Sequence, residues 1–336
     1  MVLKNLNILT IVKSLRMSAS VSRRIRALGL SAPSVVFRFD GDADAYSDAL
    51  ITRCGPGQFR VSLSPLKLER IALYAKHRLP SAIYYLSCCP DAIKSMSIDY
   101  SDGDRNSNAD FCWSAHDPAR GLLPDSHFFD ARGFSAIRQL AENQDAQWNS
   151  RSDTIRWRGG PNGAGTVTAD PAAIYDPEVM QRVRLCMVAS AIPEVDVKIV
   201  PHGDLADPFK GGGRHLTGTR IEEKSWITDK YAIDVDGHSN SWSNFLIRLH
   251  LGCCVFKIGS QFGYRQWYYD RIRPWEHFVP VRADMRDLAE KIDWARSNPD
   301  KAKEIARNGQ AFARSMTFES ETAYAVNAIT GHRHAA

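Results

Sequence analysis

The chain has 336 residues, of which 44% are hydrophobic and 24% charged, a composition typical of a globular protein long enough for two hydrophobic cores. Its formal net charge of +5 suits an anionic substrate or a membrane surface without requiring nucleic acid, and no apolar run reaches the ~20 residues of a membrane span. The seven cysteines are an odd number without a CxxC spacing, which argues against a zinc site or a disulfide framework and favours a reducing compartment.

Residues 1–32 form a basic segment at the start of the chain. Seven Lys and Arg residues occur up to Arg38, and the first acidic residue is Asp40. Apolar residues between Leu3 and Leu15, interrupted by Lys13, make the segment amphipathic, so that it can lie on an anionic bilayer. A solvated tail, or a segment packed on its own domain, fits the same pattern. The stretch is too short and too polar for a secretory signal peptide.

Residues 33–150 alternate short apolar runs with loops. Strands are predicted at 35–39, 59–63, 82–86 and 111–114, and helices at 66–77 and 133–143. Pro80 is expected to end the first of these helices, because proline removes a helical hydrogen bond and clashes with the preceding turn. The polar stretch 99–110 is expected to be a loop.

The second half of the chain is more regular. Strands are predicted at 154–159, 195–200, 231–235, 253–258 and 278–281, with helices at 177–190, 242–251, 264–269, 284–298, 299–309 and 318–328. Gly309 is expected to end the helix that Pro299 begins. Strands alternating with helices predict a parallel sheet covered by helices on both faces. Two such halves, joined near residue 150, describe a two-lobed α/β enzyme.

The segment 230–257 organises this second half. It reads as a buried strand, a polar turn at 236–241, a helix that Gly252 stops, and a second buried strand. The turn is rich in residues that cap helices and tolerate unusual backbone angles. Free N–H groups and the helix dipole at such a turn attract anions. We therefore expect the diphosphate of an activated sugar to bind here.

Several motifs together resemble one family of enzymes. They are Trp157-Arg-Gly159, the run from Lys230 to Gly237, Asn240-Ser-Trp-Ser243, the run Gln266-Trp-Tyr-Tyr-Asp-Arg-Ile-Arg-Pro-Trp-Glu-His-Phe-Val-Pro-Val281, and Ala306-Arg-Asn-Gly-Gln-Ala-Phe312. The chain resembles the capsule-associated and lipopolysaccharide-modifying glycosyltransferases of family 90, which includes the Rumi-type protein O-glucosyltransferases. The resemblance implies a GT-B fold of two Rossmann-like lobes, a UDP-sugar donor, inversion at the anomeric carbon and no obligatory metal or other cofactor.

On this basis the chain divides into four parts. Residues 1–32 are the basic segment, 33–150 the acceptor-side lobe, 151–315 the nucleotide-sugar lobe, and 316–336 a C-terminal helix and tail that can cross back to the first lobe.

Inverting transfer needs a carboxylate that takes the proton of the acceptor hydroxyl. The resemblance places this base in the acidic run 99–104, and we favour Asp102. Three acids in six residues leave the register open, so that Asp104 and Asp99 remain candidates. Asp117 is the next candidate, although its place in an Asp-Pro turn favours a role in shaping the loop.

The donor site needs cations and N–H groups aimed at the leaving diphosphate. Arg158 precedes two glycines at a strand end, and its guanidinium can enter a cleft where the backbone approaches the ligand. Ser241 and Ser243 are alternatively helix caps, and Trp242 is alternatively a core residue. Trp275 and Phe278 are expected in the core. The donor-binding candidates are Arg158, Gly159, Asn240, Ser241, Trp242, Ser243, Asn244, Arg248 and Tyr264.

The pair Asp234-Val-Asp236 has the Asp-x-Asp spacing of a metal-binding glycosyltransferase motif. Asp234, however, lies inside an apolar strand, and the resemblance is to a different fold. We therefore expect no metal at this pair.

The resemblance leaves the acceptor open. The bacterial branch implies a cytoplasmic enzyme, able to lie peripherally on the inner membrane, which moves glucose or xylose to lipopolysaccharide core or a related glycan. The alternatives are a protein O-glycosyltransferase and a non-catalytic protein that binds anionic glycan or nucleic acid.

Overall fold

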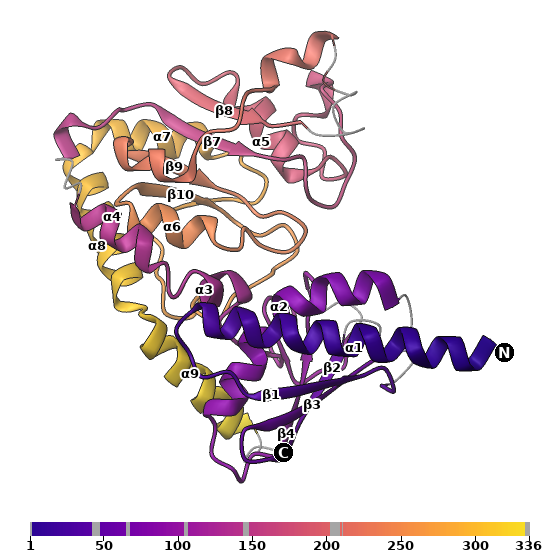
Figure 1. Cartoon of the computed structure of the whole chain (residues 1–336). Helices are drawn as coiled ribbons and strands as arrows, with labels where there is room; N and C mark the ends of the chain where they lie inside the picture. The colour runs from indigo at the N-terminus through magenta and orange to yellow at the C-terminus, as the bar shows by residue number, and fades with distance from the viewer. Residues whose placement is uncertain are drawn as a thin grey trace. The chain divides into compact units, whose positions relative to one another are not determined.

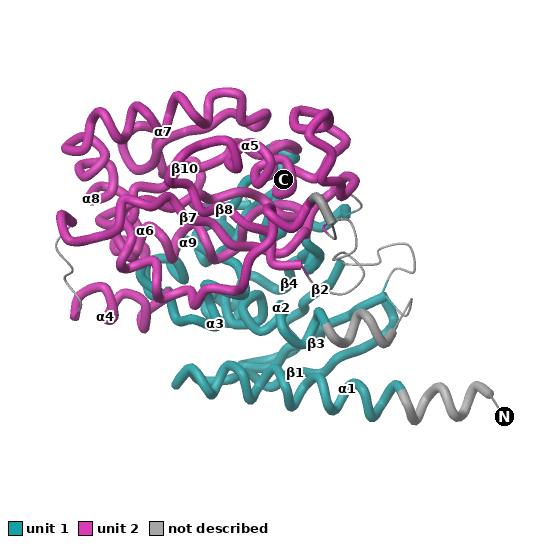
Figure 2. The backbone as a smooth tube through the Cα atoms, turned by 90° about the horizontal axis from the view of Figure 1, so that it is seen from above, with its two compact units in different colours: residues 1–133, 265–267, 317–336 teal, residues 134–264, 268–316 magenta. Residues whose placement is uncertain are grey.

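The computed structural model describes residues 2–41, 48–64, 68–103, 107–143, 148–201, 209 and 211–332. The chain divides into two units, each of which has its own sheet (Figure 2). Unit 1 contains residues 1–133, 265–267 and 317–336, and unit 2 contains 134–264 and 268–316. The C-terminal segment thus belongs with the N-terminal half of the chain.

Unit 1 has a mixed sheet with the strand order β1-β3-β2-β4-β5-β6. The strands are β1 Ser34–Arg38, β2 Asp48–Gly55, β3 Gln58–Leu63, β4 Ser95–Asp99, β5 Phe111–Cys112 and β6 Gly121–Leu122. Strand β2 is antiparallel to both of its neighbours, which departs from the predicted parallel arrangement. Only Pro56 and Gly57 separate β2 from β3, and a connection this short joins antiparallel strands only.

Four α-helices in the described part of the chain belong to unit 1: α1 Val2–Ala27, α2 Leu68–Cys88, α3 Ser126–Asp130 and α9 Phe318–His332. Helices α1 and α2 lie side by side, and α9 packs against α2 and β6 (Figure 1). Two predictions fail in α2, since the helix continues through Pro80 and includes residues 82–86, which were expected to form a strand. Its side chains there, among them Leu79, Ile83 and Leu86, are buried. Tertiary packing thus outweighs the local cost of the proline.

Unit 2 has a five-stranded, fully parallel sheet with the order β11-β10-β9-β7-β8. Its strands are β7 Ile155–Gly159, β8 Val195–Ile199, β9 Tyr231–Asp234, β10 Cys254–Ile258 and β11 Val279–Val281. Its α-helices are α4 Ser135–Asn143, α5 Gln181–Ala189, α6 Asn244–His250, α7 Leu288–Ser297 and α8 Pro299–Ser315, and its 3-10 turns are η1 Trp148–Ser150, η2 Pro171–Ala173, η4 Gly211–Leu216 and η5 Glu223–Thr228. Helices α5 and α7 cover one face of the sheet, while α6 and α8 cover the other (Figure 1). The predicted parallel sheet with helices on both faces is confirmed for this unit.

Two predictions in the second half are wrong. Helix α8 does not end at Gly309 but continues to Ser315. A Cβ at Gly309 would lie 2.5 Å from the carbonyl oxygen of His277, so the glycine serves close packing rather than termination. Residues 264–269 do not form a helix, because Arg265 pairs instead with Ala115 through two backbone hydrogen bonds.

All seven cysteines are free thiols. Among the described helices, none combines the length and the apolar character that crossing a bilayer requires.

Candidate functional site

The topology of unit 2 marks one edge of its sheet as a place for a ligand. The strands run β8-β7-β9-β10-β11, so successive connections leave β7 in opposite directions. In parallel sheets of this kind, ligands bind outside the carboxyl ends of the strands at the point of this reversal. A cavity of about 530 Å³ lies there, lined by residues that follow β7 and β8 and by one side of α6.

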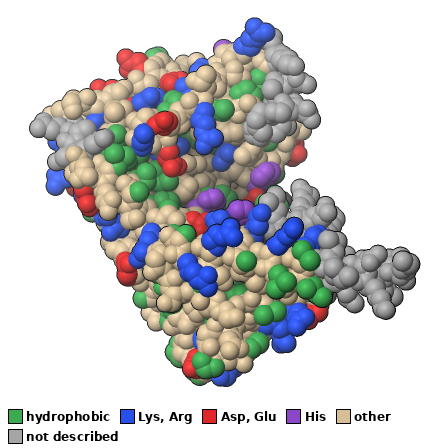
Figure 3. All heavy atoms as spheres, viewed as in Figure 1, with side chains coloured by type: hydrophobic (Ala, Val, Ile, Leu, Met, Phe, Trp, Pro, Cys, Tyr) green, Lys and Arg blue, Asp and Glu red, His purple; other side chains and the backbone are tan. Residues whose placement is uncertain are grey.

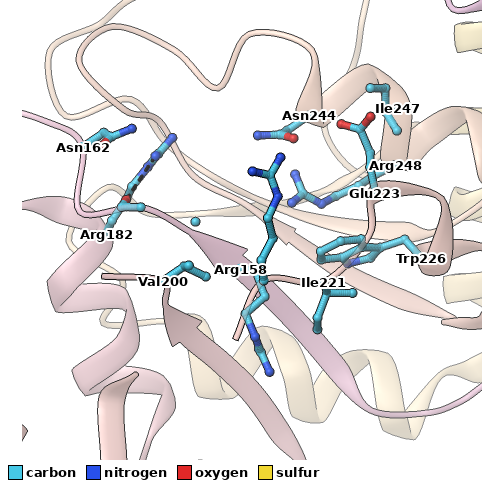
Figure 4. Close-up of a pocket in the computed structure, with 13 residues that line it drawn as sticks. Arg158, Asn162, Arg182, Val200, Ile221, Glu223, Trp226, Asn244, Ile247 and Arg248 are labelled. Carbon is cyan, nitrogen blue, oxygen red and sulfur yellow. Dashed lines mark hydrogen bonds between the residues drawn. The ribbon is translucent and has the colours of Figure 1, made fainter. Parts of the chain in front are cut away.

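Four arginines line this cavity: Arg158, Arg182, Arg220 and Arg248. Asn162 and Arg182 lie on one side of it, Trp226 and Arg248 lie on the other, and Arg158 lies between them (Figure 4). Such a concentration of guanidinium groups favours a ligand with several negative charges.

Arg158 lines the cavity, as do Gly159, Asn244 and Arg248 among the predicted residues. Its guanidinium makes a bidentate ion pair with Asp196, at 2.7 and 2.9 Å. The remaining N–H groups donate to the carbonyl oxygens of Trp157, Asp196 and Thr219. All five N–H donors of Arg158 are therefore used within the protein. Arg158 can attract an anionic ligand through its positive charge, but it has no free N–H group to donate to that ligand.

Arg182 and Arg248 are in a different state. Arg182, in α5, donates from Nε to the Asp236 carbonyl at 2.9 Å and from Nη1 to the Gly160 carbonyl, while its Nη2 has no acceptor in the described part of the chain. Arg248, in α6, is 4% exposed, and to the described residues its guanidinium makes one hydrogen bond, from Nη1 to Asp234 at 3.2 Å. Its Nε is buried without a partner among the residues that the structure describes. Within the described ranges, Arg248 thus keeps a buried donor without an acceptor, which is costly, and Arg182 keeps an unpaired Nη2, so both arginines are suited to receive an anion.

The two arginines are anchored to one segment of β9 and the turn after it. Lys257 bridges the carboxylates of Asp234 and Asp236, with its Nζ 2.8 Å from each. Burial alone would raise the pKa of Asp234, but the charges of Lys257 and Arg248 outweigh it and lower the pKa. Burial raises the pKa of Asp236 despite Lys257, and the two carboxylates raise the pKa of Lys257 against its own burial.

This pair is the Asp-x-Asp sequence considered as a metal motif. Its bridging position is filled by the Lys257 ammonium, and Ser241 donates a further hydrogen bond to Asp234 at 2.9 Å. Throughout the described ranges, no group of three His, Cys, Asp or Glu side chains is arranged to hold a metal ion.

The predicted turn residues lie beside the cavity rather than in its lining. Asn240 and Ser241 are buried, and the Asn240 side-chain oxygen accepts a hydrogen bond from the Trp242 backbone N–H. Trp242 has a positive φ of 52°, and Ser243 precedes α6 without a side-chain cap bond. Only from Asn244 onward does the helix border the cavity. Tyr264 is also buried and is not among the lining residues.

The candidate bases belong to unit 1. Asp102 is 43% exposed at its side chain and pairs with Arg78. Asp99, at the end of β4, is buried, and its carboxylate accepts two hydrogen bonds from Ser101. Asp104 lies outside the described residues. Of the two described acids, Asp102 is the one that solvent can reach.

Sequence reasoning missed several lining residues, most importantly Arg182 and Trp226. Arg182 carries a usable signal, because a charged residue in a helix that is buried along its whole length needs a special partner. Trp226, in η5, follows a charged loop and has no pattern around it that would indicate its role.

Residues 134–332 match the sequence model of Glycosyl transferase family 90. The chain belongs to this family. The predicted family resemblance is thereby confirmed.

Curated relatives are similar over shorter stretches. Uncharacterized protein 179R of Invertebrate iridescent virus 6 is 35% identical over 51% of this chain and 16% of its own length. Protein O-glucosyltransferase 2 of Danio rerio is 43% identical over 25% of this chain and 16% of its own length. The chain thus spans about a sixth of these relatives. A crystal structure of Anabaena Alr3699/HepE in complex with UDP-glucose aligns at 11% identity and a TM-score of 0.36, over 57% of this chain and 53% of that one.

Proposed function

We propose that this chain is a UDP-sugar-dependent glycosyltransferase and that the cavity of unit 2 binds the donor. The observation that carries the proposal is the pair Arg182 and Arg248, which border the cavity with donors that no acceptor among the described residues satisfies. A nucleoside diphosphate supplies such acceptors at the topological switch point of a parallel sheet.

Different parts of the cavity lining suit the two ends of such a donor. Arg182 on one side, Arg248 on the other and the charge of Arg158 between them neutralise the diphosphate that leaves as the sugar is transferred. Ile221, Trp226 and Ile247 form an apolar part of the lining suited to a nucleotide base, with the Arg248 guanidinium 5.0 Å from the centre of the Trp226 ring.

In the proposed reaction, the acceptor hydroxyl attacks the anomeric carbon as the bond to the diphosphate breaks, with inversion. Asp102 takes the hydroxyl proton, a role that its exposure permits and that the burial of Asp99 opposes. We further propose that the two units are the lobes of a GT-B enzyme and that arginines and Lys257 supply the positive charge without a metal ion.

For the acceptor we propose a hydroxyl of lipopolysaccharide core or a related glycan, with glucose or xylose as the transferred sugar. A protein hydroxyl is the second candidate, and the similarity to proteins named protein O-glucosyltransferase favours it. Incubation with UDP-glucose and UDP-xylose, together with de-glucosylated lipopolysaccharide or folded protein modules, separates the two by which acceptor becomes labelled.

We also propose that α1 contacts an anionic membrane surface. Ile11 and Leu15 are 57% and 64% exposed, and the exposed Arg16 and Arg23 follow on the same helix. Basic and hydrophobic side chains lie side by side where α1 crosses unit 1 (Figure 3). Flotation with vesicles containing phosphatidylglycerol tests this contact: Leu15→Ser and Arg16→Gln should each reduce binding, and vesicles of phosphatidylcholine alone should not bind.

The donor site is tested by calorimetric titration of UDP and UDP-glucose into the wild-type chain and into Arg182→Gln and Arg248→Gln. Each substitution removes a charged donor and should weaken binding by about tenfold or more. Arg214→Gln, at an exposed arginine outside the cavity lining, is the control. Unchanged UDP affinity in both cavity variants, with their folds intact, would place the donor elsewhere.

A further inference from the structure

An exposed tryptophan lies on unit 2 outside the arginine cavity. Trp275 was expected in the core, but it is 44% exposed and has a positive φ of 64°. Its backbone N–H donates to the Phe278 carbonyl at 2.7 Å, so a tight turn holds it in this conformation. A left-handed backbone is unfavourable for a bulky residue and persists where the surrounding structure enforces it.

Trp275 forms one wall of a groove of about 330 Å³, which we call the Trp275 groove. Its other walls include Glu276, Trp294, Glu304 and Asn308, from the same turn and from helices α7 and α8. The two indole rings meet edge to face, with centroids 4.8 Å apart. Aromatic surface thus lines one part of the groove, and carboxylate and amide groups line another.

The polar groups of the groove have unused hydrogen-bonding capacity. Among the described residues, neither indole N–H group nor the Asn308 amide has a hydrogen-bond partner. Glu304 pairs with Lys301 at 3.1 Å, and Glu276 lies near Arg273 and His277, so the rim carries nearly balanced charge. A polyanion has no net attraction to such a rim.

We propose that the Trp275 groove is an accessory site for a neutral saccharide. The apolar face of a sugar ring packs on Trp275, while its hydroxyl groups accept from the indoles and Asn308 and donate to Glu276 and Glu304. The groove precedes β11 and therefore lies toward the amino ends of the parallel strands, whereas the arginine cavity lies at their carboxyl ends. It therefore does not serve the donor, although the choice of a saccharide rests on the proposed function as a glycosyltransferase.

The experiment titrates cellotetraose, maltotetraose and xylotetraose into the full chain, with binding followed by NMR and by tryptophan fluorescence. The test variant is Trp275→Gly, because glycine accepts the positive φ and the fold should persist without the ring. At least one tetrasaccharide should bind the wild type, and Trp275→Gly should weaken that binding tenfold or more. Asn308→Ala should weaken it severalfold and provides a second probe, at a half-buried residue of the groove lining.

The matched control is Tyr175→Ala. Tyr175 is another exposed aromatic residue of unit 2, 38% exposed, and it does not line the groove. A cation lies over each ring, Arg286 over Tyr175 at 4.3 Å and Lys291 over Trp275 at 5.4 Å, so the two variants differ in the groove rather than in this contact. This variant should bind the tetrasaccharide like the wild type. UDP titration of every variant should give wild-type affinity, so failure at the groove is distinguishable from failure of the donor site. The proposal is overturned if no tetrasaccharide binds, if Trp275→Gly and Asn308→Ala bind as well as the wild type, or if decaproline binds in preference to the sugars.

Discussion

Two aspartate-rich segments of this chain lie at the end of a strand, yet the acids Asp234 and Asp236 in one and Asp102 in the other have opposite surroundings. Asp234 and Asp236 are buried around Lys257, whereas Asp102 is 43% exposed and pairs with Arg78. A buried carboxylate surrounded by cations is committed to holding them in place. An exposed carboxylate remains accessible to a reacting hydroxyl. The environment, rather than the spacing of the acids, separates a structural role from a chemical one.

The largest expected effect tests the chemical side of this comparison. Asp102→Asn removes the proposed base, and the rate of sugar transfer should fall by about 10²–10⁴-fold while UDP affinity stays unchanged. Radiolabelled transfer and calorimetry measure the two quantities. Asp91→Asn is the control, because Asp91 is an exposed acid of unit 1 that also pairs with an arginine, Arg53, at 3.0 Å. Full activity in Asp102→Asn would reassign the base.

The structural side is tested by Asp234→Asn. This change leaves Arg248 and Lys257 with one carboxylate fewer in a buried setting, and the free energy of unfolding should fall by about 3–5 kcal/mol. Urea denaturation measures it. The control is Asp153→Asn. Asp153 pairs with Lys230, but its side chain is 68% exposed, so its loss should lower the free energy of unfolding by about 1 kcal/mol or less. Equal losses of unfolding free energy in the two variants would contradict a structural role for the buried Asp234.

His250, a buried histidine in α6, extends the comparison of buried and exposed ionisable groups to the dependence of stability on pH. Burial, and then the charges of Arg138 and Arg314, lower the pKa of His250 to about 3 from its ordinary value of 6.5. Between pH 3 and pH 6.5, His250 is therefore protonated in the unfolded chain but neutral in the folded chain. Stability attributable to His250 should be lost as the pH falls from 6.5 toward 3, by up to about 1.4 kcal/mol per pH unit.

The measurement is urea denaturation of the wild type and His250→Gln at several pH values. The difference between the two unfolding free energies should change with pH only below about 6.5. A constant difference down to pH 4 would contradict a neutral buried imidazole.

The smallest expected effect concerns metal ions. Because Lys257 already bridges Asp234 and Asp236, UDP-glucose should raise the melting temperature equally with EDTA, Mg²⁺ or Mn²⁺. Donor-dependent stabilisation that disappears in EDTA would mean that a metal takes part in donor binding.

The local sequence pattern predicted the secondary structure correctly where apolar periodicity and turn residues agree. The segment from β9 to β10 follows the predicted strand, turn, helix and strand, with Gly252 in the left-handed conformation after α6. Pattern failed where distant packing decides. Pro80 lies inside α2, Gly309 lies inside α8 against the His277 carbonyl, and Arg265 pairs with Ala115 instead of joining a helix.

The amino-acid sequence by itself determined the family, the parallel sheet of unit 2 and the presence of Arg158 and Arg248 near its ligand edge. Only the tertiary structure decided which arginines keep free donors, that Lys257 takes the bridging place between two aspartates, and that Trp275 faces solvent. The physical reason is that strand and helix patterns depend on neighbours within a few residues. Burial and hydrogen-bond satisfaction depend on partners far away in the chain, which no local spacing records.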